Sequence, residues 1–246
     1  MNVGLLECDH VDERLQSVAG GYPEMFRALL NPYLPELEFT RYDAAHGELP
    51  SSFDNCDAWL CTGSRAAVYD ATPWIEALKA FVRSLRGSGR PYVGICFGHQ
   101  LLAAAFGGTV QKSANGWGIG SLPVEVIEQR PWMEPPLATC RLHYMHQDQV
   151  TALPEGATLL ARGEHCEVAV FTVDDSMLGI EGHPEFPMAY MAALLRERTE
   201  RLGADRVQQA LEGLVQLTDD AILARWIARF FSCTFPAAPD LSRHSC

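Results

Sequence analysis

This sequence is short of positive charge. Its 246 residues contain 19 Lys and Arg against 31 Asp and Glu, which gives a formal net charge of -12, and no basic run offsets it. Nucleic acids and anionic membrane surfaces are bound through clusters of cationic side chains. We therefore expect no nucleic-acid partner and no membrane partner.

Long hydrophobic runs are also missing. No stretch approaches the about 20 consecutive apolar residues that are needed to span a bilayer. The first nine residues lack a basic segment and soon reach acidic residues, so we expect no signal peptide. Hydrophobic residues nevertheless make up 48% of the chain, which is enough to bury a substantial core.

The eight cysteines show no grouping typical of a disulfide framework. They are scattered, and several lie within apolar, strand-like runs. Together with the missing export signal, this predicts reduced thiols in the cytoplasm. Six of the eight are expected to be small packing residues: Cys8, Cys56, Cys61, Cys140, Cys166 and Cys233.

Repeats and low-complexity segments are absent, and strand-like and helical patterns alternate along the first half of the chain. Strands are expected at 3–6, 38–42, 57–62 and 92–95, and helices at 23–30, 73–86 and 101–106. Further strands are expected at 122–128, 139–145, 158–161, 167–173 and 177–180, and helices at 187–202, 205–214 and 219–231. This order predicts an α/β fold with a mainly parallel central sheet flanked by helices, a small antiparallel addition and a C-terminal helical extension. Residues 232–246 are expected to form a docked or frayed tail.

The most informative segment runs from 92 to 100, Tyr-Val-Gly-Ile-Cys-Phe-Gly-His-Gln. An apolar strand enters a cysteine flanked by Gly94 and Gly98, and a helical pattern follows directly. Small residues at these positions permit a sharp turn from strand to helix that presents the side chain of Cys96. Because the free N–H groups at a helix start favour an anion, we expect this thiol to ionise more readily than a free cysteine and to act as a nucleophile.

A second segment, 179–186, supplies a base and a group that orients it. Pro184 favours extended backbone at His183, and residues two apart in an extended chain point to the same side. His183 and Glu185 can therefore reach one site from a strand end, where open α/β sheets place their sites. An imidazole held by a carboxylate suits a general base beside Cys96.

Together these segments resemble the class I (triad) glutamine amidotransferase family, in particular stand-alone members similar to the amidotransferase half of GMP synthetase and to γ-glutamyl peptidases. The resemblance rests on 94–100 and on Gly-His-Pro-Glu at 182–185. It is supported by Thr-Gly-Ser at 62–64, Gly-Trp-Gly-Ile-Gly at 116–120 and His-Gln-Asp-Gln-Val at 146–150. It implies a flavodoxin-like domain over 1–190, with 191–246 as a helical extension packed on the same domain.

The resemblance implies hydrolysis of a γ-glutamyl amide through a glutamyl thioester on Cys96, with His183 moving the proton and Glu185 orienting His183. Backbone N–H groups of Gly63 and Phe97 would form the oxyanion hole. Gln100 matches the position that contacts the glutamyl group, and the segments that carry Trp117, His146 and Gln147 match loops lining the pocket. No cofactor and no metal are expected.

Some residues in these motifs have simpler explanations. His99 suits a structural or supporting role at the start of the helix, and Trp117 could equally cap the core or contact substrate. His143, His146, His165 and Cys166 could suggest a metal. However, His143 and His146 are three apart on a strand and face opposite sides, which disfavours shared coordination.

Three functions fit these residues. The first is the glutaminase component of an amidotransferase that delivers ammonia to a separate synthase, since no glycine-rich phosphate-binding loop follows residue 190. The alternative is a free-standing γ-glutamyl peptidase that cleaves γ-glutamyl peptides or conjugates. The third is an inactive binding module, which the complete set of three site residues disfavours. In the first two cases the partner is a small-molecule γ-glutamyl substrate.

Overall fold

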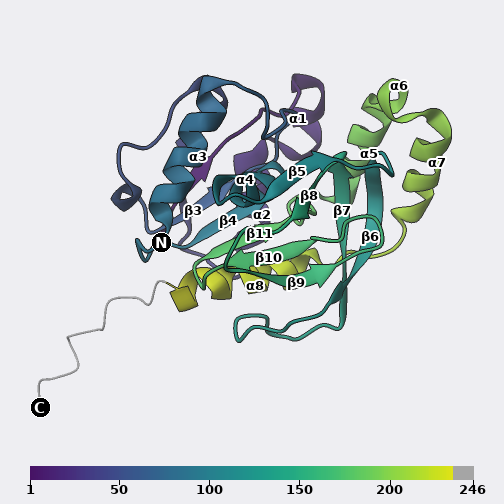
Figure 1. The fold of residues 1–246 in the computed structure, drawn as a ribbon. Helices are drawn as coiled ribbons and strands as arrows, with labels where there is room; N and C mark the ends of the chain where they lie inside the picture. The colour runs from purple at the N-terminus through teal and green to yellow at the C-terminus, as the bar shows by residue number, and fades with distance from the viewer. Residues whose placement is uncertain (235–246) are drawn as a thin grey trace, which may run out of the picture.

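The structure is a computed structural model that describes residues 1–234 (Figure 1). Of the tail expected at 232–246, residues 235–246 lie outside the described residues. The helices are α1 Glu13–Ala19, α2 Tyr22–Leu30, α3 Pro73–Leu85, α4 Phe97–Ala105, α5 Met188–Glu197, α6 Thr199–Leu202, α7 Ala204–Gly213 and α8 Asp220–Thr234, with short 3-10 helices η1 Ala44–His46 and η2 Phe53–Asn55. The strands are β1 Asn2–Leu6, β2 Glu38–Tyr42, β3 Ala58–Cys61, β4 Tyr92–Ile95, β5 Thr109–Lys112, β6 Gly118–Val126, β7 Thr139–His146, β8 Asp148–Ala152, β9 Ala157–Arg162, β10 Val170–Val173 and β11 Met177–Ile180.

A nine-stranded sheet forms the centre of the described chain, in the order β2-β1-β3-β4-β11-β10-β9-β6-β7. The strands from β2 to β11 in this order pair in parallel. Those from β11 to β7 pair antiparallel. The α/β class with a helix-flanked sheet is confirmed, but the antiparallel part is larger than expected. It extends the main sheet by four strands, and β5 and β8 form a separate antiparallel pair.

Helices cover the sheet on both faces and bury two separate apolar layers (Figure 1). One layer contains Phe26 of α2, Leu195 of α5 and Phe230 of α8. The other contains residues of α3 and α4 packed around Trp59. The strands β3, β4, β10 and β11 are buried along their whole length, as parallel and central strands between two helical layers must be.

The C-terminal helices are part of the first layer. α5 packs on α1, α8 packs on α2, and α7 packs on β6. The single helix expected at 187–202 is divided at Arg198, where α5 ends and α6 begins. Arg198 at the division and Arg201 on α6 line one cavity together with Cys96, which follows β4.

The sequence pattern missed three elements. α1 is not among the helices expected from the sequence, because only Leu15 on this short helix is buried and its apolar periodicity is weak. The Asp12 side chain caps it by accepting from the Arg14 N–H. β5 and β8 pair with each other outside the main sheet, so neither shows the continuous apolar run of a buried strand.

No helix among residues 1–234 has both the length and the apolar character that crossing a bilayer requires.

The turn between β4 and α4 depends on two glycines. Cys96 at the corner has φ 49° and ψ -100°, in a region that L-residues rarely adopt. A Cβ at Gly94 would collide with the carbonyl of Gly98, and a Cβ at Gly98 would lie 2.6 Å from the carbonyl oxygen of Cys61. The helix can approach β3 and β4 this closely only because both positions lack a side chain.

We expect Gly98→Ala to lower the free energy of unfolding by about 1–3 kcal/mol, because the new methyl group meets backbone atoms that cannot rotate away. Urea denaturation followed by circular dichroism measures this. Gly213→Ala, at a helical glycine with no atom within 4 Å of the added methyl group, is the matched control and should leave stability unchanged or slightly higher. Equal stability of the two variants would contradict this account of the turn.

Candidate active site

Cys96 lies at the carboxyl end of the parallel strands, between β4 and the start of α4. Its backbone N–H donates to the carbonyl of Ile180 at 2.9 Å, continuing the pairing of β4 with β11 in which Ile95 lies opposite Ile180. The chain that leaves β11 therefore runs directly beside Cys96. The residue is only 5% exposed but lines a cavity that opens to solvent.

His183 and Glu185 point to the same side of the segment after β11, as their spacing predicts. His183 Nδ1 lies 2.8 Å from Glu185 Oε1, and both side chains are buried. The Phe186 ring stacks on the imidazole with centroids 4.0 Å apart and planes within 5°. The backbone N–H of His183 donates to the carbonyl of His143 on β7 at 2.7 Å. The imidazole is thus held at its edge by Glu185 and on its face by Phe186, while β7 holds the backbone of His183.

Gly63, just after β3, lies next to both Cys96 and His183. A Cβ built on Gly63 would lie 2.9 Å from His183 Cε1, 3.8 Å from His183 Nε2 and 3.6 Å from Cys96 Cβ. With Nδ1 facing Glu185, the ring turns its Nε2 edge toward this point. Cys96 and His183 also line one narrow cavity together. The structure therefore brings the cysteine, the imidazole–carboxylate pair and Gly63 into one site.

A larger cavity of about 250 Å³, called here the inner cavity, adjoins Cys96 on the side of α4. The four residues predicted to contact substrate, Gln100, Trp117, His146 and Gln147, all line it. The Gln100 amide is already bound within the protein: Nε2 donates to Glu181 Oε1 at 2.8 Å and to the carbonyl of Asp148 at 2.9 Å.

The expectation that the Cys96 thiol ionises more readily than a free cysteine is wrong. Burial, followed by the charges of Glu181 and Glu185, raises the pKa of the Cys96 thiol well above its ordinary value. The Phe97 N–H and the Arg198 guanidinium act in the opposite direction, but more weakly. Desolvation of a thiolate outweighs the helix N-terminus here, because the sulfur is enclosed by protein.

Glu181 is a buried carboxyl group that sequence reasoning overlooked. It follows β11 directly, and its side chain is fully enclosed. Its oxygens lie 3.3 Å from His99 Nε2 and 3.7 Å from His146 Nδ1, and Gln100 donates to it. Burial raises the pKa of Glu181 well above its ordinary value, so the neutral acid is favoured. A glutamate that ends a wholly apolar strand was the feature that could have drawn attention to it.

The histidines around Glu181 carry no positive charge that could stabilise its anion. Burial lowers the pKa of His99 and the pKa of His146 to about 3. His99 is fully buried on α4 and sets its ring edge against Phe171 at 4.9 Å, in keeping with the structural role that we expected. The polar groups around Glu181 are thus linked as neutral partners beneath the inner cavity.

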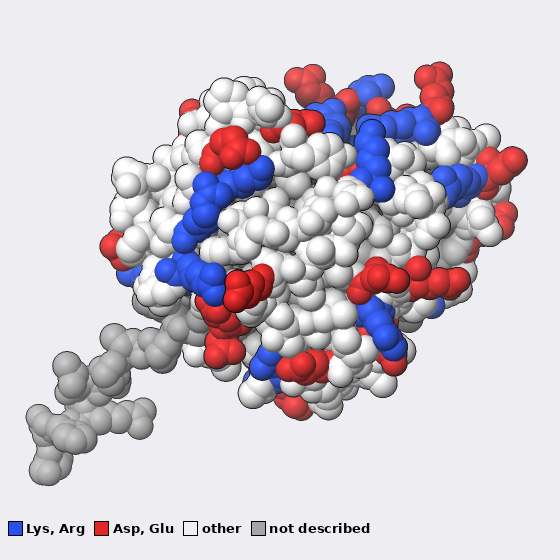
Figure 2. All heavy atoms as spheres, viewed as in Figure 1, with Lys and Arg blue, Asp and Glu red and all other residues white. Residues whose placement is uncertain are grey.

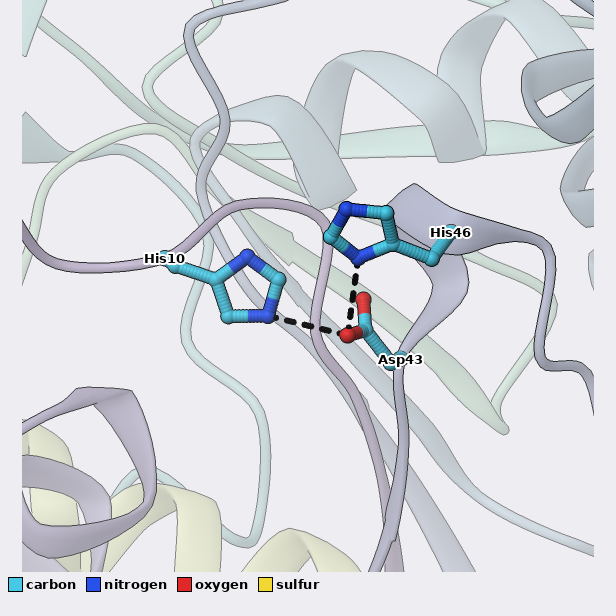
Figure 3. Close-up of side chains that lie close together, drawn as sticks. All are labelled: His10, Asp43 and His46. Carbon is cyan, nitrogen blue, oxygen red and sulfur yellow. Dashed lines mark hydrogen bonds and ion pairs between the residues drawn. The ribbon is translucent and has the colours of Figure 1, made fainter.

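Potential metal ligands gather elsewhere. Within residues 1–234, one group of three has its ligand atoms within 4.8 Å of one another, namely His10, Asp43 and His46 (Figure 3). His10 Nε2 and His46 Nδ1 both face Asp43 Oδ2, at 3.1 and 2.9 Å. Hydrogen bonding to this shared oxygen accounts for the arrangement. The group considered from the sequence does not converge: His146 and His165 are neighbours at 5.8 Å between ring centroids, whereas the backbone of His143 pairs with His183.

The fold and this geometry describe an α/β protein with a buried cysteine at a strand–helix turn beside an imidazole–carboxylate pair. Residues 31–198 match the family described as glutamine amidotransferase class-I. The chain belongs to this family.

Relatives within the family carry different names. The chain is 28% identical to a glutamine amidotransferase-like protein of Schizosaccharomyces pombe, over 93% of this chain and 98% of the other. It is 33% identical to gamma-glutamyl peptidase 4 of Arabidopsis thaliana, over 68% of each chain. It is 34% identical to the glutamine-hydrolyzing GMP synthase subunit of Methanoculleus marisnigri, over 57% of this chain and 76% of the other.

Solved structures share the fold. A glutamine amidotransferase from Thermotoga maritima superimposes with a TM-score of 0.76 at 19% identity, covering 96% of this chain and 99% of the other. The fold assigned above on strand order is therefore that of class I glutamine amidotransferases.

The raised pKa of the Cys96 thiol has a measurable consequence. Its thiolate fraction is small at neutral pH and grows as pH rises, so alkylation by iodoacetamide should still accelerate above pH 9, the ordinary thiol pKa. Glu185→Gln keeps the size of the side chain but removes a carboxylate that raises the pKa of the Cys96 thiol, so the rate profile should move to lower pH. Mass spectrometry of the Cys96 peptide gives the rates.

The matched control for this experiment is Glu167→Gln, which removes an exposed carboxylate beside Cys166. It should leave the profile of Cys96 unchanged. A wild-type profile that levels off well below pH 9, or one that Glu185→Gln does not move, would contradict the assigned electrostatics.

Proposed function

We propose that this protein hydrolyses γ-glutamyl amide bonds through a glutamyl thioester on Cys96. The observation that carries the proposal is the common position of Cys96, His183 and Gly63, with Cys96 and His183 lining one narrow cavity and Glu185 behind the imidazole. Membership of the class I glutamine amidotransferase family supports the same chemistry.

In the proposed first step, the thiol proton passes from Cys96 Sγ to His183 Nε2 as the sulfur attacks the amide carbonyl carbon. A buried thiol with a raised pKa suits transfer that accompanies attack better than a stored thiolate. A C–S bond forms, and the C–N bond then breaks as the imidazolium gives its proton to the leaving nitrogen. Glu185 stabilises the imidazolium through Nδ1.

In the second step, water attacks the thioester carbon while His183 takes one of its protons. The C–S bond breaks, the sulfur recovers a proton, and a free γ-carboxylate leaves. Backbone N–H groups of Phe97 and Gly63 are proposed to hold the carbonyl oxygen in both steps, a contribution of about 3–4 kcal/mol per donor in comparable sites. Both residues flank the sulfur, in keeping with this role.

The inner cavity is the proposed glutamyl-binding site. Gln100 and His146 form its floor through their links to Glu181 and Asp148, whereas Trp117 and Gln147 stand at its side. Because Gln100 is held by two hydrogen bonds, we propose that it shapes the floor and orients Glu181 as well as facing the substrate.

Two versions of this function have separate support. A glutaminase component that supplies ammonia to a separate synthase is favoured by the similarity to the GMP synthase subunit of Methanoculleus marisnigri. A free-standing γ-glutamyl peptidase is favoured by the longer match to gamma-glutamyl peptidase 4. Ammonia release from glutamine that depends on an added synthase would indicate the first, and cleavage of γ-glutamyl dipeptides by the chain alone would indicate the second.

Two accompanying proposals concern the whole chain. Residues 1–190 and the extension 191–246 are proposed to act as one domain, since α5, α7 and α8 share the core of the sheet. Action in the cytoplasm is supported by the free thiols of the described cysteines.

The proposed nucleophile can be tested with a chloroketone analogue of glutamine. It should add one equivalent of mass to Cys96 in wild type and none at this position in Cys96→Ala, with an unchanged melting temperature. Cys140→Ala, at a buried cysteine outside the site, should still be labelled at Cys96. Labelling that Cys96→Ala does not abolish, or a folded wild type that is never labelled, would overturn the thioester proposal.

Glu185 offers a second test of the mechanism. Glu185→Gln keeps the size of the side chain but no longer stabilises the imidazolium, so kcat should fall by about 10²- to 10⁴-fold in whichever γ-glutamyl hydrolysis the wild type performs. Steady-state kinetics measures this, and KM should change far less. A kcat within a factor of two of wild type would rule out the assigned role.

A further inference from the structure

A second cavity lies close to Cys96 and shares Arg65, Arg198 and Arg201 with the inner cavity. This outer cavity has a volume of about 260 Å³ and is lined by Tyr22, Tyr190 and three arginines, Arg65, Arg198 and Arg201, among others. A narrow cavity of about 30 Å³, lined by Cys96 and His183, shares Tyr22, Tyr190, Arg65 and Arg198 with it. The outer cavity therefore begins where the narrow one leads away from the sulfur.

The proposed chemistry indicates on which side of the sulfur the leaving group departs. His183 must deliver a proton to the departing nitrogen, so the leaving group departs on the side of the imidazole. The glutamyl group occupies the inner cavity, which the predicted substrate residues line. Ammonia would fill only a fraction of the narrow cavity, whereas the outer cavity has room for an amino acid or a short peptide.

Most carboxylates of the outer cavity are already paired. Asp9 receives two bonds from Arg65, at 2.7 and 2.8 Å. Asp12 and Glu197 are bridged by Arg14, at 2.7 and 3.0 Å. Glu200 is the remaining acidic residue of the lining.

In the part of the chain that the structure describes, Arg198 and Arg201, at the α5–α6 junction, lack the close ion pairs that Arg65 and Arg14 form. Among residues 1–234, the ion-pair partner of Arg198 is Glu197, at 3.8 Å, and Glu197 already has the closer partner Arg14. Arg201 has no ion pair within the described residues, and its guanidinium lies 4.6 Å from the centre of the Trp117 ring. The backbone N–H of Arg201 donates to the backbone carbonyl of Arg198. The two residues therefore lie one helical turn apart on the same side of the chain.

The charge of Arg198 reaches the sulfur itself, since it lowers the pKa of the Cys96 thiol. Both arginines line the same cavity as Cys96, so their positive charge lies beside the proposed nucleophile. Figure 2 shows cationic and acidic side chains crowded together along the upper edge of this view, over the part of Figure 1 where α1 and α5 are labelled.

We propose that Arg198 and Arg201 form a subsite for the carboxylate of an amino-acid or peptide leaving group, which makes γ-glutamyl peptides with a free C-terminal carboxylate the substrate class. This inference rests on the proposed thioester function and extends it. A guanidinium binds a carboxylate through paired N–H donors, and such charge-assisted bonds are strong in a partly enclosed site. The start of the C-terminal extension would then determine specificity in addition to packing on the sheet.

The test compares three substrates in wild type and in Arg198→Gln, Arg201→Gln and Arg196→Gln. The substrates are γ-glutamyl-glycine, γ-glutamyl-glycinamide, which lacks the leaving-group carboxylate, and a γ-glutamyl-glycine whose glutamyl α-carboxylate is amidated. Arg196→Gln is the matched control, because Arg196 is exposed on α5 and lines neither cavity. The quantity measured is the ratio of kcat/KM values within each variant, which does not depend on the folded fraction.

We expect Arg198→Gln and Arg201→Gln to lower kcat/KM for γ-glutamyl-glycine by about 10- to 100-fold and for γ-glutamyl-glycinamide by less than about threefold, as loss of a charge-assisted bond would produce. Arg196→Gln should leave every ratio unchanged. Arg198→Lys should recover part of the loss, since it restores charge without the planar fork.

Other outcomes overturn the inference. If both arginine variants lose the same factor on the glycine and glycinamide substrates, the leaving-group carboxylate is not their ligand. If the loss disappears only when the glutamyl α-carboxylate is amidated, the arginines bind the glutamyl end instead. If the wild type cleaves glutamine but neither γ-glutamyl-glycine nor γ-glutamyl-glycinamide, the subsite is ruled out and the thioester function is not affected. A folded wild type that cleaves no γ-glutamyl amide overturns both.

Discussion

The parallel pairing of β4 with β11 is the contact on which the site depends. Residues 92–95 and 177–180 are far apart in the chain, yet their register sets Ile95 opposite Ile180, and the Cys96 N–H continues the ladder to the Ile180 carbonyl. The turn into α4 and the segment after β11 therefore leave the sheet at the same level. A shift of one residue in this register would turn the side chains on one strand to the opposite face and separate sulfur from imidazole.

Burial determines which protonation states the side chains of this site adopt. Cys96, Glu181 and the neighbouring histidines are removed from water, so their neutral forms are favoured and the sulfur holds its proton until a base takes it. Glu185 is fixed against His183, where it can stabilise a transient imidazolium. The proposed reaction thus separates charge only while substrate is bound, and Arg198 is the cation whose charge acts on the sulfur.

Much of the architecture could be predicted from local patterns. The strand that ends at Ile95 and the glycines around Cys96 are readable because the chemistry of the turn is local. The weakly apolar helix α1 and the paired strands β5 and β8 were missed, since their stability comes from contacts with distant segments. The pKa of the thiol was predicted in the wrong direction, because a sequence shows the helix start but not the depth of burial.

The sequence by itself determined the chemical groups of the candidate site and their local orientation. A cysteine between spaced glycines and a His-Pro-Glu segment specify a sharp turn and a same-side pair through backbone sterics alone. Only the tertiary structure decided how those groups meet, how deeply they are buried and what surrounds them. Glu181 beneath the inner cavity and the Arg198–Arg201 pair that lines both cavities occupy their places through sheet register and helix packing, which depend on contacts between residues far apart in the chain.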